Sequence, residues 1–231
     1  MPRIMLKLSG EALAGDKHTG FDEESVRVVA RQVRSLYDTG AEIAVVIGGG
    51  NFWRGRTGNE IDRVKSDQIG MLATVMNCIY VSEIFKSEGM DACIMTPFAC
   101  SSFTEPYSVD KARAYLTEKK IVFFAGGTGH PYFSTDTGVV LRSLEIQADM
   151  ILLAKAVDGV YDADPATHPD AKRYDTISLA EVVEQGLQVM DLTASVLAKD
   201  NHLELRVFAL QEENSILKAA SGKFNGTVVT A

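Results

Sequence analysis

Short apolar segments alternate with longer segments of helical periodicity along most of the chain. The short segments are apolar at nearly every position, which is typical of strands buried on both faces. We expect strands over residues 4–8, 43–47, 93–95, 121–124, 150–154 and 205–209.

Helical patterns fill most of the intervals between these strands. Apolar residues recur at helical spacing in residues 26–37, where Asp22 is placed to cap the amino end and Gly40 to follow the carboxyl end. Further helices are expected over residues 109–118, 135–146 and 178–187. The last of these begins with a capping box, in which Ser178 and Glu181 stand at the required spacing.

One expected helix differs from the others in its distribution of apolar residues. Residues 67–88 are apolar on nearly every side of a helix, including Met71, Val75, Ile79 and Phe85. A helix of this kind needs burial on more than one face. We therefore expect it to be buried in the core or at a subunit interface.

The alternation of strands and helices predicts an α/β fold with a mainly parallel sheet flanked by helices on both faces. Asn225 and Gly226 precede the apolar residues 227–230, which suggests a terminal hairpin or edge strand and the one antiparallel feature. The chain has no internal repeat, low-complexity tract or flexible linker. We expect residues 1–231 to form a single domain with two lobes.

Composition excludes several classes of protein. The chain has 31 Asp and Glu against 23 Lys and Arg, and its formal charge of −8 argues against sequence-independent binding of nucleic acid or anionic lipid. Cys78, Cys93 and Cys100 have no disulfide or zinc-ligand spacing, and the histidines lack the pattern of a zinc enzyme. No secretory segment or membrane span is expected, which predicts a cytoplasmic protein.

Three of the expected strands end in loops that contain glycine, at residues 8–10, 47–51 and 125–129. Ligands bind beyond the carboxyl ends of parallel strands, and glycine allows backbone N–H groups to approach a phosphate. Ordinary turn chemistry explains any single loop, but three together favour a site for an extended polyphosphate. None matches the Rossmann or Walker pattern, and the chain lacks the G-x-S-x-G elbow of serine hydrolases.

Three charged residues lie in or near these loops. Lys7 is inside an apolar strand, where an ammonium group needs an anion unless the strand is a solvent-facing edge. Arg54 follows the glycine run 48–50 and is either a second phosphate ligand or a solvated loop residue. Asp136 stands at the expected start of a helix, where it either caps the helix or orients lysines or a metal.

Residues 157–165 are rich in turn formers and follow an expected strand. They lack the alternating acidic ligands and the distal glutamate of a calcium loop. Within them, Tyr161 either offers a flat surface to a base or packs beneath its own loop.

An ordered set of motifs extends over essentially the whole chain. It consists of residues 6–13 (LKLSGEAL), 46–51 (VIGGGN) with Arg54 and Gly55, Asp67 with 70–77 (GMLATVMN), 127–129 (GTG), 157–161 (VDGVY) with Asp164 and Pro165, and 189–192 (VMDL). This set resembles the amino-acid kinase family, and within it the bacterial kinases that act on UMP. The resemblance implies an amino-acid kinase-like fold over residues 1–231, with a nucleoside-monophosphate lobe and an ATP lobe.

The resemblance also implies an activity and a set of site residues. The implied reaction transfers the γ-phosphoryl group of Mg-ATP to UMP, giving UDP and ADP in pyrimidine biosynthesis, by a homohexamer under allosteric nucleotide control. Magnesium is implied to arrive with ATP, without direct protein ligands. Catalytic roles are implied for Lys7, Arg54 and Asp136. ATP is implied to contact Lys7, Ser9, Gly10, Gly50, Arg54, Lys155, Tyr161 and Asp164, and UMP to contact Gly49, Asp67, Thr128, Gly129, His130, Pro131, Tyr132, Phe133, Ser134 and Thr135.

Two segments depart from the sequence that is usual in this family. Lys155 stands where the family often has threonine, and Ala156 where it often has a second lysine. In the loop implied to bind uridine, His130 replaces the more usual asparagine.

Two other functions are compatible with the same pattern. A kinase of an amino acid or carbamate would share the ATP loops, but it would leave Asp67 and the loop at Thr128 without a role. A non-catalytic nucleotide-binding protein of the same fold is the second alternative, and the presence of both Lys7 and Asp136 argues against it.

Overall fold

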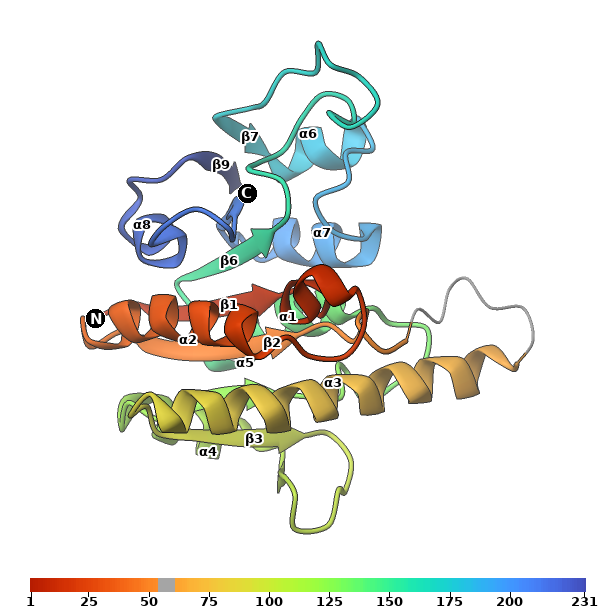
Figure 1. The fold of residues 1–231 in the computed structure, drawn as a ribbon. Coiled ribbons are helices and arrows are strands. Elements are labelled where there is room, and N and C mark those ends of the chain that lie inside the picture. The colour runs from red at the N-terminus through yellow and green to blue at the C-terminus, as the bar shows by residue number, and fades with distance from the viewer. Residues whose placement is uncertain (54–60) are drawn as a thin grey trace.

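The structure is a computed structural model that describes residues 1–53 and 61–231. A nine-stranded sheet runs through this part of the chain, in the order β4-β3-β5-β2-β1-β6-β8-β9-β7 (Figure 1). Its strands are β1 (Arg3–Leu8), β2 (Glu42–Ile47), β3 (Ala92–Thr96), β4 (Glu105–Pro106), β5 (Ile121–Phe124), β6 (Met150–Lys155), β7 (Thr176–Ser178), β8 (Leu205–Ala209) and β9 (Gly226–Thr230). The helices are α1 (Glu11–Ala14), the 3-10 turn η1 (Gly15–Lys17), α2 (Glu23–Tyr37), α3 (Arg63–Ser87), α4 (Val109–Thr117), α5 (Thr135–Ile146), α6 (Leu179–Glu184), α7 (Leu192–Asp200) and α8 (Ser215–Ser221).

The expected α/β class is confirmed. Among the described strands, every ladder is parallel except the one between β8 and β9. Each strand expected from an apolar run is present, and the predicted limits of α5 and β8 agree with the observed ones. The expected caps are also present, because the Asp22 side chain accepts a hydrogen bond from Ser25 N and Ser178 forms a capping box with Glu181.

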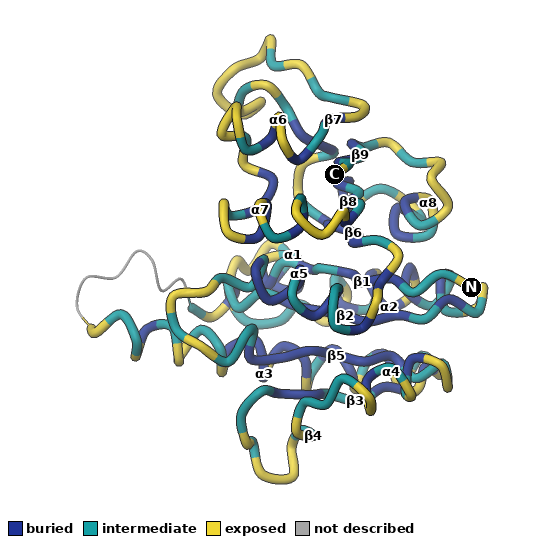
Figure 2. The backbone as a smooth tube through the Cα atoms, turned by 180° about the vertical axis from the view of Figure 1, so that it is seen from behind, coloured by how far each residue is buried: buried dark blue, intermediate teal, exposed yellow. Residues whose placement is uncertain are grey.

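Alternate residues of the central strands face two separate hydrophobic cores. On β1, Ile4, Leu6 and Leu8 belong to the core that α2, α3 and α8 cover. Met5 belongs to the opposite core, which α4 to α7 cover. Figure 1 shows α2 and α3 in front of the sheet, and Figure 2 shows that the central strands are the most buried part of the backbone. Because side chains alternate along a strand, Lys7 points to the same face as Met5, toward α5.

Strand β1 lies where the winding of the chain changes direction. The chain passes from β1 to β2 on one side, and α5 later returns it to β6 on the other side. Lys7 is in register with Val46 of β2 and with Leu153 of β6. Open parallel sheets bind ligands at such a switch point, just beyond the carboxyl ends of the strands. The fold therefore places Lys7 at the expected ligand-binding edge.

The carboxyl-terminal part of the sheet corrects one expectation. The segment expected as a terminal hairpin or edge strand, β9, does pair antiparallel with β8, but α8 separates the two strands. It is not an edge, because β7 pairs with its other side in parallel. Strand β7 has three residues, too few for its alternation to be recognised in the sequence.

Helix α3 begins at Arg63 rather than at the expected Asp67, with Asp62 as its amino-terminal cap. Its buried residues include Val75, Cys78 and Phe85. By length and composition alone α3 passes the test for a membrane-spanning helix, although 44% of its apolar window is buried inside the molecule. Core helices of soluble proteins meet the same criterion, so this feature is weak evidence for a membrane span.

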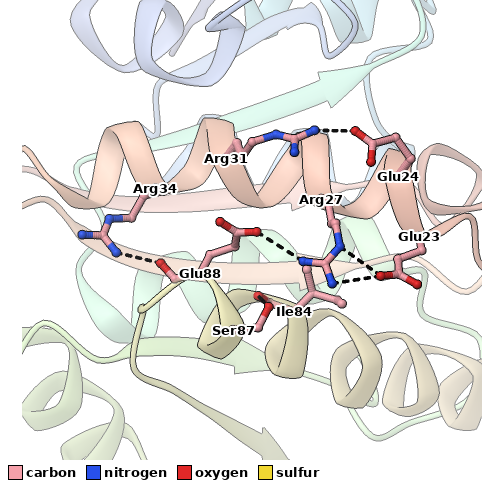
Figure 3. A network of polar contacts seen from close by, with 8 residues as sticks. All are labelled: Glu23, Glu24, Arg27, Arg31, Arg34, Ile84, Ser87 and Glu88. Carbon is pink, nitrogen blue, oxygen red and sulfur yellow. Dashed lines mark hydrogen bonds and ion pairs between the residues drawn. The ribbon is translucent and has the colours of Figure 1, made fainter.

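The carboxyl end of α3 is joined to α2 by arginine contacts (Figure 3). Arg34 donates to the backbone oxygen of Glu88 at 2.7 Å, which satisfies a carbonyl at the end of the helix. Arg27 lies between two carboxylates, 2.9 Å from Glu23 and 3.3 Å from that of Glu88. These contacts hold the end of α3 that is remote from the ligand-binding edge of the sheet.

Candidate active site

A cavity of about 660 Å³ opens beyond the carboxyl ends of β1, β2, β5 and β6. This volume lies within the range of small-molecule sites. Its walls are formed by Lys7, Ser9, Gly10, Glu11, Gly48, Gly49, Gly50, Trp53, Arg63, Ser66, Asp67, Gly70, Met71, Thr74, Gly126, Gly127, Thr128, His130, Phe133, Ser134, Thr135, Asp136, Lys155, Gln188, Val189, Met190 and Asp191. The three glycine loops therefore meet at one cavity.

An ion pair between Lys7 and Asp136 lies in this cavity. Lys7 Nζ is 3.1 Å from Asp136 Oδ1, and the two side chains are 15% and 24% exposed. Ser134, not Asp136, caps α5, because its Oγ accepts a hydrogen bond from Thr137 N. The carboxylate of Asp136 is thus available to orient a lysine, and the lysine in the apolar strand has the anion it requires.

Lys155 adds a second ammonium group to the same cavity. It ends β6, and its Nζ donates to the backbone oxygen of Val189. Burial lowers the pKa of Lys155, Asp136 opposes that effect by attraction, and repulsion from Lys7 adds to it. Lys155 therefore belongs to the same electrostatic cluster as Lys7 and Asp136, and the binding of an anion there would favour its charged form.

The amino-terminal ends of α5 and α7 meet at the cavity wall. Asp191 caps α7 by accepting a hydrogen bond from Ala194 N at 3.0 Å. Its carboxylate also accepts hydrogen bonds from the hydroxyl groups of Ser134 and Thr137, both at the start of α5. Helix amino termini carry partial positive charge and free N–H groups, which favour bound phosphate.

The loop after β5 depends on glycine for its course. Gly126 and Gly127 have φ angles of +81° and +58°, in the left-handed region that side chains disfavour. Thr74 of α3 fixes the start of this loop, because its Oγ1 accepts a hydrogen bond from Gly126 N at 2.8 Å. The loop is thereby held against α3 with its backbone turned toward the cavity.

The next part of that loop is joined to the first turns of α3 by Asp67. Asp67 Oδ2 accepts hydrogen bonds from Tyr132 N at 2.8 Å and from Arg63 Nε at 2.9 Å. The guanidinium group of Arg63 also lies over the Tyr132 ring, 5.3 Å from its centroid. These contacts connect two segments that are distant in sequence and set one wall of the cavity.

Most of the site residues expected from the sequence line this single cavity. Gly129, Pro131 and Tyr132 are in the same loop but do not line it. Tyr161 and Asp164 also lie outside the lining, and their side chains have local partners: Tyr161 donates to Asp158 Oδ1 at 2.6 Å, and Asp164 accepts from Ala166 N. Arg54 is outside the described residues.

Four chemically important residues of the cavity were not assigned from the sequence: Glu11, Trp53, Arg63 and Asp191. A signal was present for Asp191, because it precedes apolar residues at helical spacing and so has the position of a cap. For Arg63 the signal was absent, because its approach to the cavity depends on α3 beginning before Asp67.

Comparisons with known proteins agree with this geometry. The sequence model of the amino acid kinase family matches residues 2–209. The crystal structure of UMP kinase from Bacillus anthracis is 36% identical, with 99% of this chain and 96% of that chain covered and a TM-score of 0.95. UMP kinase from Ureaplasma parvum is 30% identical, with 100% and 99% covered and a TM-score of 0.94. Uridylate kinase from Archaeoglobus fulgidus is 25% identical, with 98% and 99% covered and a TM-score of 0.74. The chain belongs to the amino acid kinase family.

Proposed function

We propose that the protein is a UMP kinase, a phosphotransferase that moves the γ-phosphoryl group of ATP to UMP and releases UDP and ADP. The observation that carries this proposal is the Lys7–Asp136 pair at the meeting point of three glycine loops, in a chain that aligns over its full length with UMP kinases. Phosphoryl transfer needs no protein nucleophile and is accelerated by alignment and by stabilisation of charge. The cavity offers the groups for both tasks.

Each part of the cavity has a task in this mechanism. Lys7 and Lys155 supply positive charge to the phosphate that is transferred, while Asp136 holds Lys7 in place. Backbone N–H groups around Gly10 and Gly50 receive the other ATP phosphates. The 15% exposure of the Lys7 side chain keeps its charge in a poorly solvated place, where it acts more strongly than in water.

The acceptor nucleotide is proposed to lie against α3 and the loop after β5. This assigns UMP to Gly49, Asp67, Thr128, Gly129, His130, Pro131, Tyr132, Phe133, Ser134 and Thr135. The hydrogen bond from Tyr132 N to Asp67 supports the grouping, because it brings the two segments to one wall. The adenosine of ATP is assigned to the side of Tyr161 and Asp164, beyond the described lining of the cavity.

Magnesium is proposed to arrive on the phosphates of ATP, where it neutralises charge during transfer. Two carboxylates of the cavity already have protein partners, which is compatible with an ion held by the ATP phosphates. Asp136 is paired with Lys7, and Asp191 accepts hydrogen bonds from Ser134 and from the amino terminus of α7. Among the described residues, no group of three or more His, Cys, Asp or Glu side chains is placed to hold a metal ion.

The purified protein with Mg-ATP is expected to convert UMP to UDP and to leave glutamate, aspartate and carbamate unphosphorylated. The acceptor wall around Asp67 and Thr128 has a role only in the first reaction. Coupled detection of ADP, together with chromatography of the products, measures both outcomes. Absence of UDP from folded protein at millimolar substrates would contradict the proposed function, and phosphorylation of an amino acid or carbamate would support the alternative.

We also propose that the protein works in the cytoplasm as a homohexamer, with one amino-acid kinase-like domain per chain and with allosteric control by a nucleotide. The support for an oligomer is a row of exposed apolar side chains along one face of α3, which we call the apolar stripe. It consists of Ile69, Leu72, Met76 and Ile79, which are 37–53% exposed. An apolar stripe of this kind on a soluble protein is typical of a subunit interface.

Light scattering of the purified protein is expected to give a mass above that of a dimer of the 25.1 kDa chain. The double substitution Leu72→Glu and Met76→Glu is expected to reduce that mass, because it places charge in the apolar stripe. Val28→Glu, at an isolated exposed apolar residue of α2, is the matched control and should leave the mass unchanged. A monomeric mass for the unmodified protein at micromolar concentration would refute the proposal.

A further inference from the structure

Two buried asparagines, Asn51 at the end of the second glycine loop and Asn77 on α3, form a reciprocal amide pair. Asn51 Nδ2 donates to Asn77 Oδ1 at 3.0 Å, and Asn77 Nδ2 donates to Asn51 Oδ1 at 2.8 Å. Asn51 is 2% exposed and Asn77 is fully buried. Polar side chains at such depth are found where they satisfy other polar groups.

The remaining donors of the pair reach two different loops. Asn77 Nδ2 donates to the backbone oxygen of Gly48 at 2.7 Å, at the start of the loop after β2. Asn51 Nδ2 donates to the backbone oxygen of Gly20 at 2.9 Å, and the backbone oxygen of Asn51 accepts from Gly20 N and from Thr19 Oγ1. All four amide N–H bonds of the pair are therefore used.

The pair also sets the position of the loop after β1. A Cβ atom placed on Gly10 would lie 2.4 Å from Asn51 Oδ1, 2.7 Å from Gly48 O and 2.9 Å from Gly50 N. Gly10 thus packs directly on the amide of Asn51 and on the backbone of the second glycine loop. The Asn51 amide therefore lies in the contact between the loop after β1, which follows Lys7, and the loop after β2.

We propose that the Asn51–Asn77 pair positions the two phosphate loops for transfer, so that both asparagines are positioning residues of the reaction. The inference rests on the proposed function, because that function assigns phosphate binding to the two loops. The hydrogen bonds of the asparagine pair are present whatever the substrate is. Amide side chains suit this task because each one both donates and accepts without charge. Misplacement of reacting groups by about 1 Å is enough to lower turnover about a hundredfold.

A second buried amide provides a matched control. Gln32 of α2 donates to the backbone oxygen of Leu210 at 3.0 Å and accepts from Ser215 Oγ at 3.0 Å. It is 7% exposed, joins α2 to the start of α8 and is not one of the residues that line the cavity. Loss of Gln32 therefore measures the effect of removing a buried amide that has no part in the phosphate loops.

The experiment compares Asn77→Leu and the milder Asn77→Ser with Gln32→Leu. All three are expected to lower Tm, because each leaves buried polar groups unpaired. Only the Asn77 variants are expected to lower kcat, by tenfold or more at a temperature where all are folded, with KM for ATP and UMP changed less than threefold. A kcat within twofold of the unmodified protein in folded Asn77 variants, or an equal loss in Gln32→Leu, would overturn the proposal.

Trp53 supplies a measurement that does not depend on activity. It is the only tryptophan of the chain and lines the cavity, and its backbone N donates to Gly49 O at 2.9 Å. Displacement of the glycine loop is expected to shift its fluorescence emission in the Asn77 variants but not in Gln32→Leu. If the unmodified protein makes no UDP, the proposed function fails while this shift still tests the positioning. Unchanged emission, or loss of folding in both Asn77 variants, would count against the inference.

Discussion

Replacement of Lys7 by alanine is expected to lower kcat by about 10²–10³, with a smaller change in KM. The ammonium group is held at 3.1 Å from Asp136 in a poorly exposed part of the cavity, so its charge is oriented before the substrates bind. Charge that is already oriented stabilises the transferring phosphate without a cost of rearrangement during the reaction. Initial rates over a range of ATP and UMP concentrations separate kcat from KM.

Lys120→Ala is the matched control for this substitution. Lys120 also pairs with an aspartate, at 3.5 Å from Asp91 Oδ2. It lies at the amino end of β5, whereas the cavity opens beyond the carboxyl ends of the strands. Its loss should leave kcat unchanged. A decrease of less than about threefold in Lys7→Ala would show that Lys7 does not lie at the phosphate that is transferred.

Asp136→Asn is expected to lower kcat by about the same factor as the loss of Lys7. The amide keeps the shape of the side chain but removes the negative charge that holds Lys7 and opposes the depression of the Lys155 pKa. Because the two residues act as a unit, the double variant Lys7→Ala with Asp136→Asn should lose much less than the product of the two single losses. The rates of the three variants form a double-mutant cycle.

A purely structural role of Asp136 in the first turn of α5, where Ser134 is the cap, has a distinct signature. Loss of a favourable contact at a helix start, such as a cap, costs about 1 kcal/mol of stability and leaves the chemistry intact. Ser108→Ala is the control, because Ser108 caps α4 through Lys111 N and lies outside the cavity lining. It is expected to lower Tm and leave kcat unchanged. The same behaviour in Asp136→Asn would exclude Asp136 from the reaction.

The apolar runs determined much of the fold, because a strand buried on both faces must be hydrophobic at successive positions. Six strands carry such runs, and the cap at Asp22 and the capping box at Ser178 mark two helix starts from local chemistry alone. The sequence also indicated that Lys7 needs an anion unless its strand is a solvent-facing edge, since its strand neighbours are apolar. These are properties of neighbouring residues and can be recognised without a structure.

The structure was needed wherever a contact joins distant segments. Asp67 accepts from Tyr132 N, and Asp191 accepts from Ser134, yet nothing near either aspartate in the sequence identifies its partner. The short strands β4 and β7 exist because longer neighbours offer them hydrogen bonds, so their own residues carry no clear signal.

The sequence alone determined the α/β class and the glycine loops at the carboxyl ends of three strands, and it identified Lys7 as a charged residue inside an apolar strand. Only the tertiary structure showed that Asp136 is the acidic partner of Lys7. Lys7 points to the face of the sheet that α5 covers, and Ser134 rather than Asp136 caps that helix. The tertiary structure also decided that Asn51, in the second glycine loop, forms a pair with Asn77 of α3. The physical reason is the sequence separation of the interacting residues. Hydrophobic periodicity and helix capping involve residues that are close in sequence, whereas these ion pairs and buried amide contacts depend on how distant elements pack.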